Sequence, residues 1–183
     1  MADLSAEKSP LTFFLLVYGL SIPLWIIKIK VDVDWLPLNF SVTDVLAAFA
    51  PLVAASILVH KEEGRTSVKK LFSRIFDGDR INEKVWYLPI AALPFLLCFL
   101  IYLIIHFAGL SLPNRWIIPF GSIPGLFTLF FLGAILEETG YMGYAIDPMQ
   151  ERFGALRAGV LIGILWAVWH FRPLFNRVTI GRG

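Results

Sequence analysis

The stretch WIIPFGSIPGLFTLFFLGAILEE, residues 116–138, decides the fold. No residue from Trp116 to Leu136 carries a charge, and two adjacent glutamates, Glu137 and Glu138, follow this run. A run of about 18 or more apolar residues is long enough to enter a bilayer as a helix. The stretch therefore predicts a transmembrane helix that carries two carboxylates at or near its end.

The composition of the whole chain agrees with a membrane protein. Of 183 residues, 57% are hydrophobic and 16% are charged, and the mean hydropathy is +0.72. Soluble globular domains are about a quarter charged. The net charge of +2 is too small to indicate a nucleic-acid partner, and Cys98, the only cysteine, excludes a disulfide within the chain.

Four further apolar segments occupy residues 11–27, 40–59, 85–112 and 158–171. The last one is short for a complete crossing of the bilayer. We expect an all-α fold, a polytopic transmembrane bundle of about five helices, and a single membrane domain over residues 1–183.

One strongly charged stretch, residues 61–84, interrupts these segments. Within it, apolar residues recur at helical spacing between basic ones, which favours an amphipathic helix on the membrane surface. A solvated connecting loop is an equal alternative. The stretch contains seven lysines and arginines, so the positive-inside rule places it in the cytoplasm.

The same rule predicts a cytoplasmic N-terminus and a cytoplasmic turn between the last two apolar segments. Arg152 and Arg157 in that turn agree, whereas the arginines after His170 disagree. We expect an integral, multi-pass protein of a prokaryotic plasma membrane.

Glu137 and Glu138 are the strongest indication of function. Insertion scales assign roughly 2.5 to 3.5 kcal/mol to a charged residue at the centre of a spanning helix, and such residues usually face the bundle interior. The alternative is that the helix reaches the membrane surface at this point.

His170 ends the last apolar segment, one helical turn after Trp166. The short connection DPMQERFG makes the last two segments antiparallel and brings Glu138 and His170 to a similar depth. A carboxylate and an imidazole at matched depth can share a metal ion or a water molecule. The sequence contains neither H-E-x-x-H nor G-x-S-x-G, so the common zinc-protease helix and serine nucleophile elbow are absent.

At these residues the chain resembles the CAAX-protease and bacteriocin-processing (CPBP, Abi) family of intramembrane metalloproteases, which includes the type II CAAX prenyl proteases. The family motif E-E-x-x-aromatic-R-G is matched by EETGYMG, with Tyr141 as the aromatic, and a second motif, aromatic-x-x-x-H, is matched by Trp166 and His170. The resemblance covers residues 125–174.

The resemblance implies an intramembrane endopeptidase acting on peptide or prenylated protein substrates among membrane lipids. It implies that Glu137, Glu138 and His170 are catalytic and that Tyr141 and Trp166 line a substrate pocket. It also implies a divalent metal such as zinc, with Glu138 and His170 as ligands.

The chain departs from the family pattern at two places. Met142 stands where the motif has arginine, and no histidine follows His170. We therefore expect a C-terminally truncated member. The alternatives are a catalytically inactive member with an immunity or scaffolding role, and a transporter piece in which the glutamates line an ion path.

Overall fold

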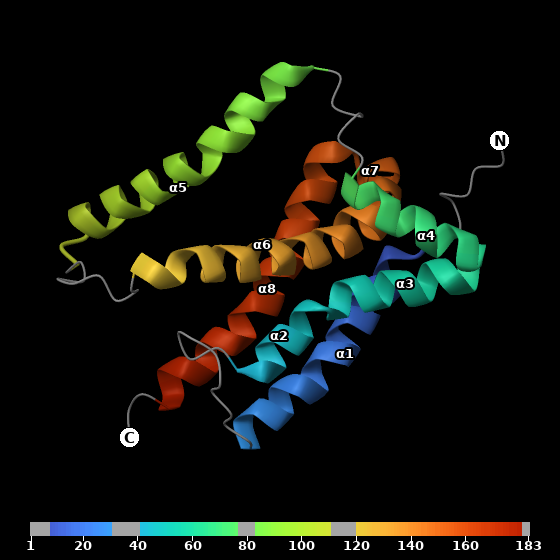
Figure 1. The fold of residues 1–183 in the computed structure, drawn as a ribbon, viewed down its shortest axis with the longest axis horizontal. Helices are drawn as coiled ribbons and strands as arrows, with labels where there is room; N and C mark the ends of the chain where they lie inside the picture. The colour runs from blue at the N-terminus through green and yellow to red at the C-terminus, as the bar shows by residue number, and fades with distance from the viewer. Residues whose placement is uncertain (1–7, 31–40, 77–82, 111–119, 181–183) are drawn as a thin grey trace. The chain divides into compact units, whose positions relative to one another are not determined.

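The structure is a computed structural model that describes residues 8–30, 41–76, 83–110 and 120–180, with side chains described for all of these except 29–30 and 171–180. Every regular element in this part of the chain is a helix (Figure 1). The prediction of an all-α fold is confirmed.

Four helical stretches are long and apolar enough to cross a membrane, namely Pro10–Lys28, Val42–Glu63, Lys84–Phe107 and Phe120–Phe153. The fifth predicted segment falls in α8, Ala155–Ile180. Its apolar part, Ala155–His170, is shorter than these four stretches, in agreement with the short segment in the sequence. The predicted cytoplasmic N-terminus and plasma-membrane location stay predictions.

The chain divides into two compact units. The smaller one, residues 76–123, contains η5 (Lys84–Trp86), α5 (Tyr87–Phe107) and η6 (Phe120–Ser122). The side chains of α5 are mostly exposed and apolar, as expected of a helix surrounded by lipid. The prediction of one domain over the whole chain stays a prediction.

The larger unit, residues 1–75 and 124–183, holds all the candidate site residues. Its helices are α1 (Pro10–Lys30), α2 (Val42–Ala48), α3 (Ala50–Glu63), α4 (Arg65–Ser73), η3 (Arg74–Phe76), α6 (Ile123–Gly140), the π-helix η7 (Tyr141–Ala145), α7 (Ile146–Phe153) and α8.

Local sequence signals fix the ends of these helices. Ser41 caps α2, because its hydroxyl accepts the Thr43 N–H while the Asp44 side chain reaches back to the Ser41 N–H. Gly64 and Gly154 have φ values of +84° and +76° and end α3 and α7. Because glycine adopts positive φ at little cost, these two positions turn the chain into α4 and α8.

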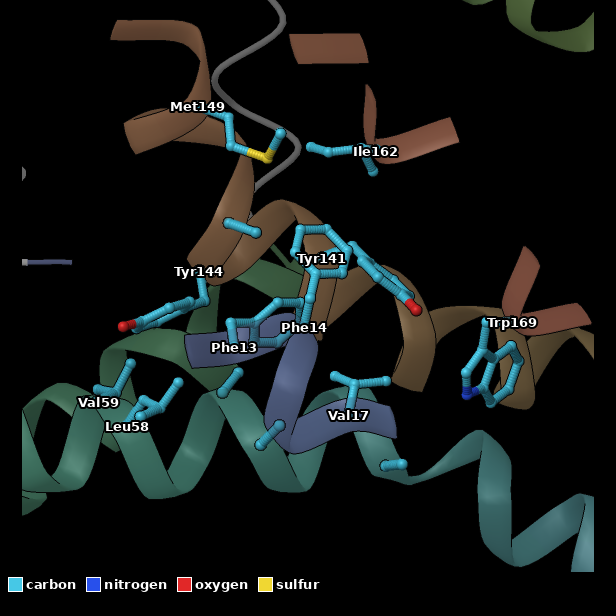
Figure 2. Close-up of a cluster of buried hydrophobic side chains, with 14 of the residues drawn as sticks. Phe13, Phe14, Val17, Leu58, Val59, Tyr141, Tyr144, Met149, Ile162 and Trp169 are labelled. Carbon is cyan, nitrogen blue, oxygen red and sulfur yellow. The ribbon is translucent and has the colours of Figure 1, made fainter. Parts of the chain in front are cut away.

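The core of the larger unit lies where α1, α3 and η7 meet (Figure 2). Phe13 of α1 is fully buried and stacks on Tyr144, with 5.5 Å between ring centroids. Tyr141 meets the edge of the same phenylalanine at 5.6 Å. The segment that follows the two glutamates is therefore fixed by aromatic packing.

Gly140 lets α6 approach α3 closely. A Cβ atom added to Gly140 would lie 2.7 Å from the Cβ of Pro51 and would also overlap the Pro51 backbone. Only glycine fits this crossing without a shift of one backbone.

Residues 65–76 of the charged stretch are helical, in α4 and η3. Leu71 is buried, and Val68 packs against the core. Part of the apolar face of α4 therefore packs on the protein, and the location of this helix at the membrane surface stays a prediction. Residues 77–82 lie outside the described part of the chain.

Candidate active site

The helix that carries the glutamates does not end at them. α6 continues to Gly140, and η7 and α7 extend the helical path to Phe153. The chain turns at Gly154. Glu137 precedes this glycine by about as many residues as His170 follows it. At 1.5 Å per residue both side chains are about 25 Å from the turn, which is why the two helices bring them together.

Glu137 and His170 face one another across this hairpin. The Oε2 atom of Glu137 is 3.8 Å from Nε2 of His170 and accepts a hydrogen bond of 3.2 Å from the indole N–H of Trp166. The Glu137 side chain is 15% exposed and the His170 side chain 39% exposed. The site is thus partly closed and remains accessible from the His170 side.

Trp166 and His170 form a pair on α8, one helical turn apart. Their ring centroids are 4.0 Å apart, and Nδ1 of His170 lies 3.0 Å from the Trp166 carbonyl oxygen. A carbonyl can only accept, so this contact assigns the proton to Nδ1 and points Nε2 toward Glu137.

α1 holds the other side of α8 in place. The indole N–H of Trp169 donates to the buried hydroxyl of Ser21 at 2.9 Å, and this hydroxyl donates to the Val17 carbonyl at 2.8 Å. The Tyr18 hydroxyl donates to the Leu165 carbonyl at 2.9 Å. These bonds fix the rotation of α8 about its axis, and with this rotation the His170 side chain points toward Glu137.

Tyr18, Ser21 and Trp169 were not among the residues predicted from the sequence. A signal was present, because Phe14, Tyr18, Ser21 and Trp25 recur at helical spacing on one face of an apolar helix. Two hydroxyls on such a face need hydrogen-bond partners inside a membrane, which indicates a packed interface with another helix.

Glu138 points to a different place from Glu137. It lines a cavity of about 260 Å³. Successive residues on a helix are about 100° apart, so the two glutamates lie on two neighbouring faces of α6. The other lining residues are Arg74, Ile75, Ile135, Thr139, Met142 and Gly143.

Arg74 joins the cavity from a distant part of the chain. Its Nη1 atom donates to the Gly143 carbonyl at 2.9 Å and lies 3.6 Å from a carboxylate oxygen of Asp147. Met142, at the arginine position of the motif, lines the same cavity. A guanidinium therefore lines the same cavity as Glu138, although it comes from η3 rather than from residue 142.

Within the described part of the chain, no ion pair or ring contact joins Tyr141 or Glu138 to the imidazole. Tyr141 is 2% exposed and lies in the core beside Phe13 and Phe14. Its assignment to a substrate pocket stays a prediction. Glu138 forms no ion pair with His170, and the structure brings Glu137 to the imidazole instead. The roles of all five predicted site residues stay predictions.

The expected divalent metal stays a prediction, because the described donors are fewer than a zinc site usually has. Within the described residues, no group of three or more histidine, cysteine, aspartate or glutamate side chains could hold a metal ion. A catalytic zinc site usually has three protein ligands, and Glu137 with His170 offers two. The described residues therefore do not fit a complete zinc site.

Both motifs lie in a region that matches a known family. Residues 119–181 match the type II CAAX prenyl endopeptidases described as Rce1-like. Over 130 residues the chain is 32% identical to CAAX prenyl protease 2 of Methanococcus maripaludis, an alignment that covers 69% of this chain and 48% of the relative. The chain belongs to this protease family. It spans about half the length of the curated relative that it matches.

Family membership and the four long apolar helices together identify an integral membrane protein. The region matched by the CAAX protease family contains α6, η7, α7 and the whole of α8. The contact between Glu137 and His170 lies within it.

Proposed function

We propose that this chain carries the catalytic centre of an intramembrane endopeptidase that cleaves prenylated protein or peptide substrates, with Glu137 as general base. The observation that supports this role is the arrangement of one carboxylate oxygen of Glu137 against Trp166 and His170. Membership of the type II CAAX prenyl endopeptidase family supports the reaction and the substrate class.

Glu137 has one oxygen engaged and one oxygen available. Both of its contacts within the described residues use Oε2, which leaves Oε1 to accept a proton from a water molecule. The hydroxide bonds to the carbonyl carbon, and the resulting intermediate breaks the carbon–nitrogen bond. The proton passes from Glu137 to the leaving nitrogen, so the step consumes one water molecule and restores the carboxylate.

His170 completes the geometry. At 3.8 Å, Nε2 is too far from Oε2 for a direct hydrogen bond, so an oxygen atom of water or substrate can contact both groups. When protonated, the imidazole donates from Nε2 to the oxygen on which negative charge develops. Contact with the Trp166 ring keeps the imidazole in this direction.

Glu138 is assigned to substrate binding in this proposal. Its cavity lies on the adjoining face of α6 and has apolar side chains from Ile75, Ile135 and Met142. Such a lining suits the apolar residues that follow the prenylated cysteine in a C-a-a-X sequence. No step is routed through a metal, because the described donor set does not make a three-ligand site.

The test is cleavage of a prenylated C-a-a-X peptide by the purified chain. We expect Glu137→Gln to lower kcat/KM by a factor of about 100 or more, the usual contribution of a general base. Glu151→Gln is the matched control, because Glu151 is an exposed glutamate of α7 away from the contact between Glu137 and His170. The two variants remove the same charge and keep the same side-chain size.

Cleavage by Glu137→Gln at the wild-type rate would remove Glu137 from the mechanism. Absence of cleavage by the folded wild-type chain would contradict the catalytic proposal and favour the non-catalytic membrane protein that the sequence left as an alternative. Circular dichroism of each variant separates loss of chemistry from loss of helix.

A further inference from the structure

We propose that the basic residues at the end of α3 and along α4 form a binding face for the phosphate headgroups of anionic lipids. This basic face consists of Lys61, Arg65, Lys69 and Lys70, all exposed. The proposed cleavage reaction does not use it, and the inference does not depend on that reaction.

The orientation of α4 turns these bases away from the protein. Leu71 is 3% exposed and packs beside Gly143. Lys69 lies about 160° around the helix from Leu71, and Arg65 is one turn before Lys69 on the same side. The packed face of α4 therefore fixes which of its side chains reach outward.

The neighbouring acids have other partners and form no ion pair with the described side chains of the basic face. Glu62 accepts a hydrogen bond of 2.7 Å from the Tyr144 hydroxyl, and Glu63 pairs with Lys8 at 3.2 Å. The side chains of the basic face form no ion pair with any described residue. Four positive charges are consequently left without a protein counter-ion in the described part of the chain.

The same contacts place the basic face at one end of the membrane-spanning helices. Lys8 precedes α1, Glu63 ends α3, and Tyr144 lies in η7, so these three elements share that end. Glu137 lies seven residues before Tyr144, about 10 Å further along the helical path. The charged end of the bundle and the apolar spans together place the bases at the height of lipid headgroups.

An exposed aromatic residue accompanies the bases. Phe72 of α4 is 41% exposed. An amphipathic helix with basic and aromatic side chains binds at the boundary between headgroups and acyl chains, where phosphates meet the bases and rings enter the apolar layer. Charge complementarity favours phosphatidylglycerol over phosphatidylcholine, because only the former has a net negative charge.

The test uses the purified full chain with an equimolar mixture of phosphatidylglycerol and phosphatidylcholine that have the same acyl chains. Native mass spectrometry gives the ratio of the two lipids retained by the protein. We expect the wild-type protein to retain phosphatidylglycerol in preference to phosphatidylcholine. In the double variant Lys69→Gln with Lys70→Gln, the ratio of retained phosphatidylglycerol to phosphatidylcholine should fall by up to about fivefold for each base lost. Lys69→Arg with Lys70→Arg should keep the preference.

Arg152→Gln with Arg157→Gln is the charge-matched control, because it removes two exposed bases from α7 and α8. This control should retain more phosphatidylglycerol than Lys69→Gln with Lys70→Gln. An equal loss in the two double variants, or no preference in the wild type, would overturn the proposal.

A second measurement does not depend on the glutamine variants. Because Cys98 is the only cysteine, Cys98→Ser with Thr66→Cys allows one fluorophore to be attached beside the basic face. In vesicles that mix phosphatidylcholine with phosphatidylglycerol we expect a blue shift relative to pure phosphatidylcholine, reversed by about 1 M NaCl through screening. Identical spectra in the two kinds of vesicle would count against the lipid-binding face.

Discussion

At the scale of single residues, the decisive feature is that Trp166 and His170 approach the same oxygen of Glu137. The indole N–H donates to Oε2, and the imidazole lies 3.8 Å from that atom. A carboxylate held at one oxygen has a defined orientation, so the direction in which its other oxygen accepts a proton is defined as well. Trp166 is therefore assigned a positioning role beyond its contact with the imidazole.

Trp166→Phe tests this assignment. The phenyl ring keeps an aromatic surface against His170 but lacks the donor to Glu137. Because hydrogen bonds to charged groups contribute about 1.5 to 3 kcal/mol, we expect kcat/KM for a prenylated peptide to fall by a factor of about 10 to 100. Trp86→Phe, at an exposed tryptophan of η5, is the control and should change little. Equal activity of the two variants would show that the indole donor is dispensable.

At the scale of elements, glycine determines how closely α6 approaches α3. Gly140 meets the backbone of Pro51, whereas Gly133, two turns earlier on α6, has no atom within 4 Å of an added Cβ. The two glycines share a helix and differ in their surroundings. Substituting each of them by alanine therefore measures how much the close crossing of α6 and α3 matters for the stability of the folded protein.

We expect Gly140→Ala to destabilise the folded protein by about 1 to 3 kcal/mol, the usual cost of adding a methyl group to a packed contact. Gly133→Ala should be neutral or stabilising by up to about 1 kcal/mol, because alanine favours the helix. Thermal unfolding in detergent measures both. Similar melting temperatures for the two variants would contradict the close approach of α6 to α3.

At the scale of the whole molecule, contacts between the beginning and the end of the described chain hold the site together. Ser21 and Trp169 are 148 residues apart in sequence and share a buried hydrogen bond. This bond orients α8 against α1, while Glu137 belongs to α6. The catalytic geometry that we propose therefore depends on helices from both ends of the sequence.

A double-mutant cycle with Ser21→Ala and Trp169→Phe measures this link. Interhelical hydrogen bonds in membranes average about 0.6 kcal/mol and reach about 1.7 kcal/mol, so we expect a coupling energy in that range. Ser21→Ala should cost less stability in the Trp169→Phe protein than in the wild type, because its hydrogen-bond partner is already absent. Equal costs in the two backgrounds would mean that the bond contributes nothing.

The sequence predicted the helical fold because long apolar runs leave a membrane protein few other ways to satisfy its backbone. It also predicted that Glu138 and His170 lie at matched depth, since a short turn constrains two antiparallel helices. It did not predict which glutamate faces the histidine, because that depends on helix rotation. The close approach of Gly140 to Pro51 fixes the rotation of α6, and the hydrogen bond from Trp169 to Ser21 fixes the rotation of α8. Both contacts join segments that are far apart in sequence.

The π-helical segment η7 changes which residues of α6 and α7 share a face. The N–H of Ile146 donates to the carbonyl of Tyr141, five residues back, so one surplus residue is accommodated within the helix. A helical wheel drawn for α6 and α7 as one uniform helix is therefore out of phase by about 100° beyond this point. Met149 of α7 is buried, but a uniform helical wheel would place it about 100° away from the buried face. Cysteine or alanine scans of α7 therefore need their own phase, counted from Ile146 rather than from Glu137.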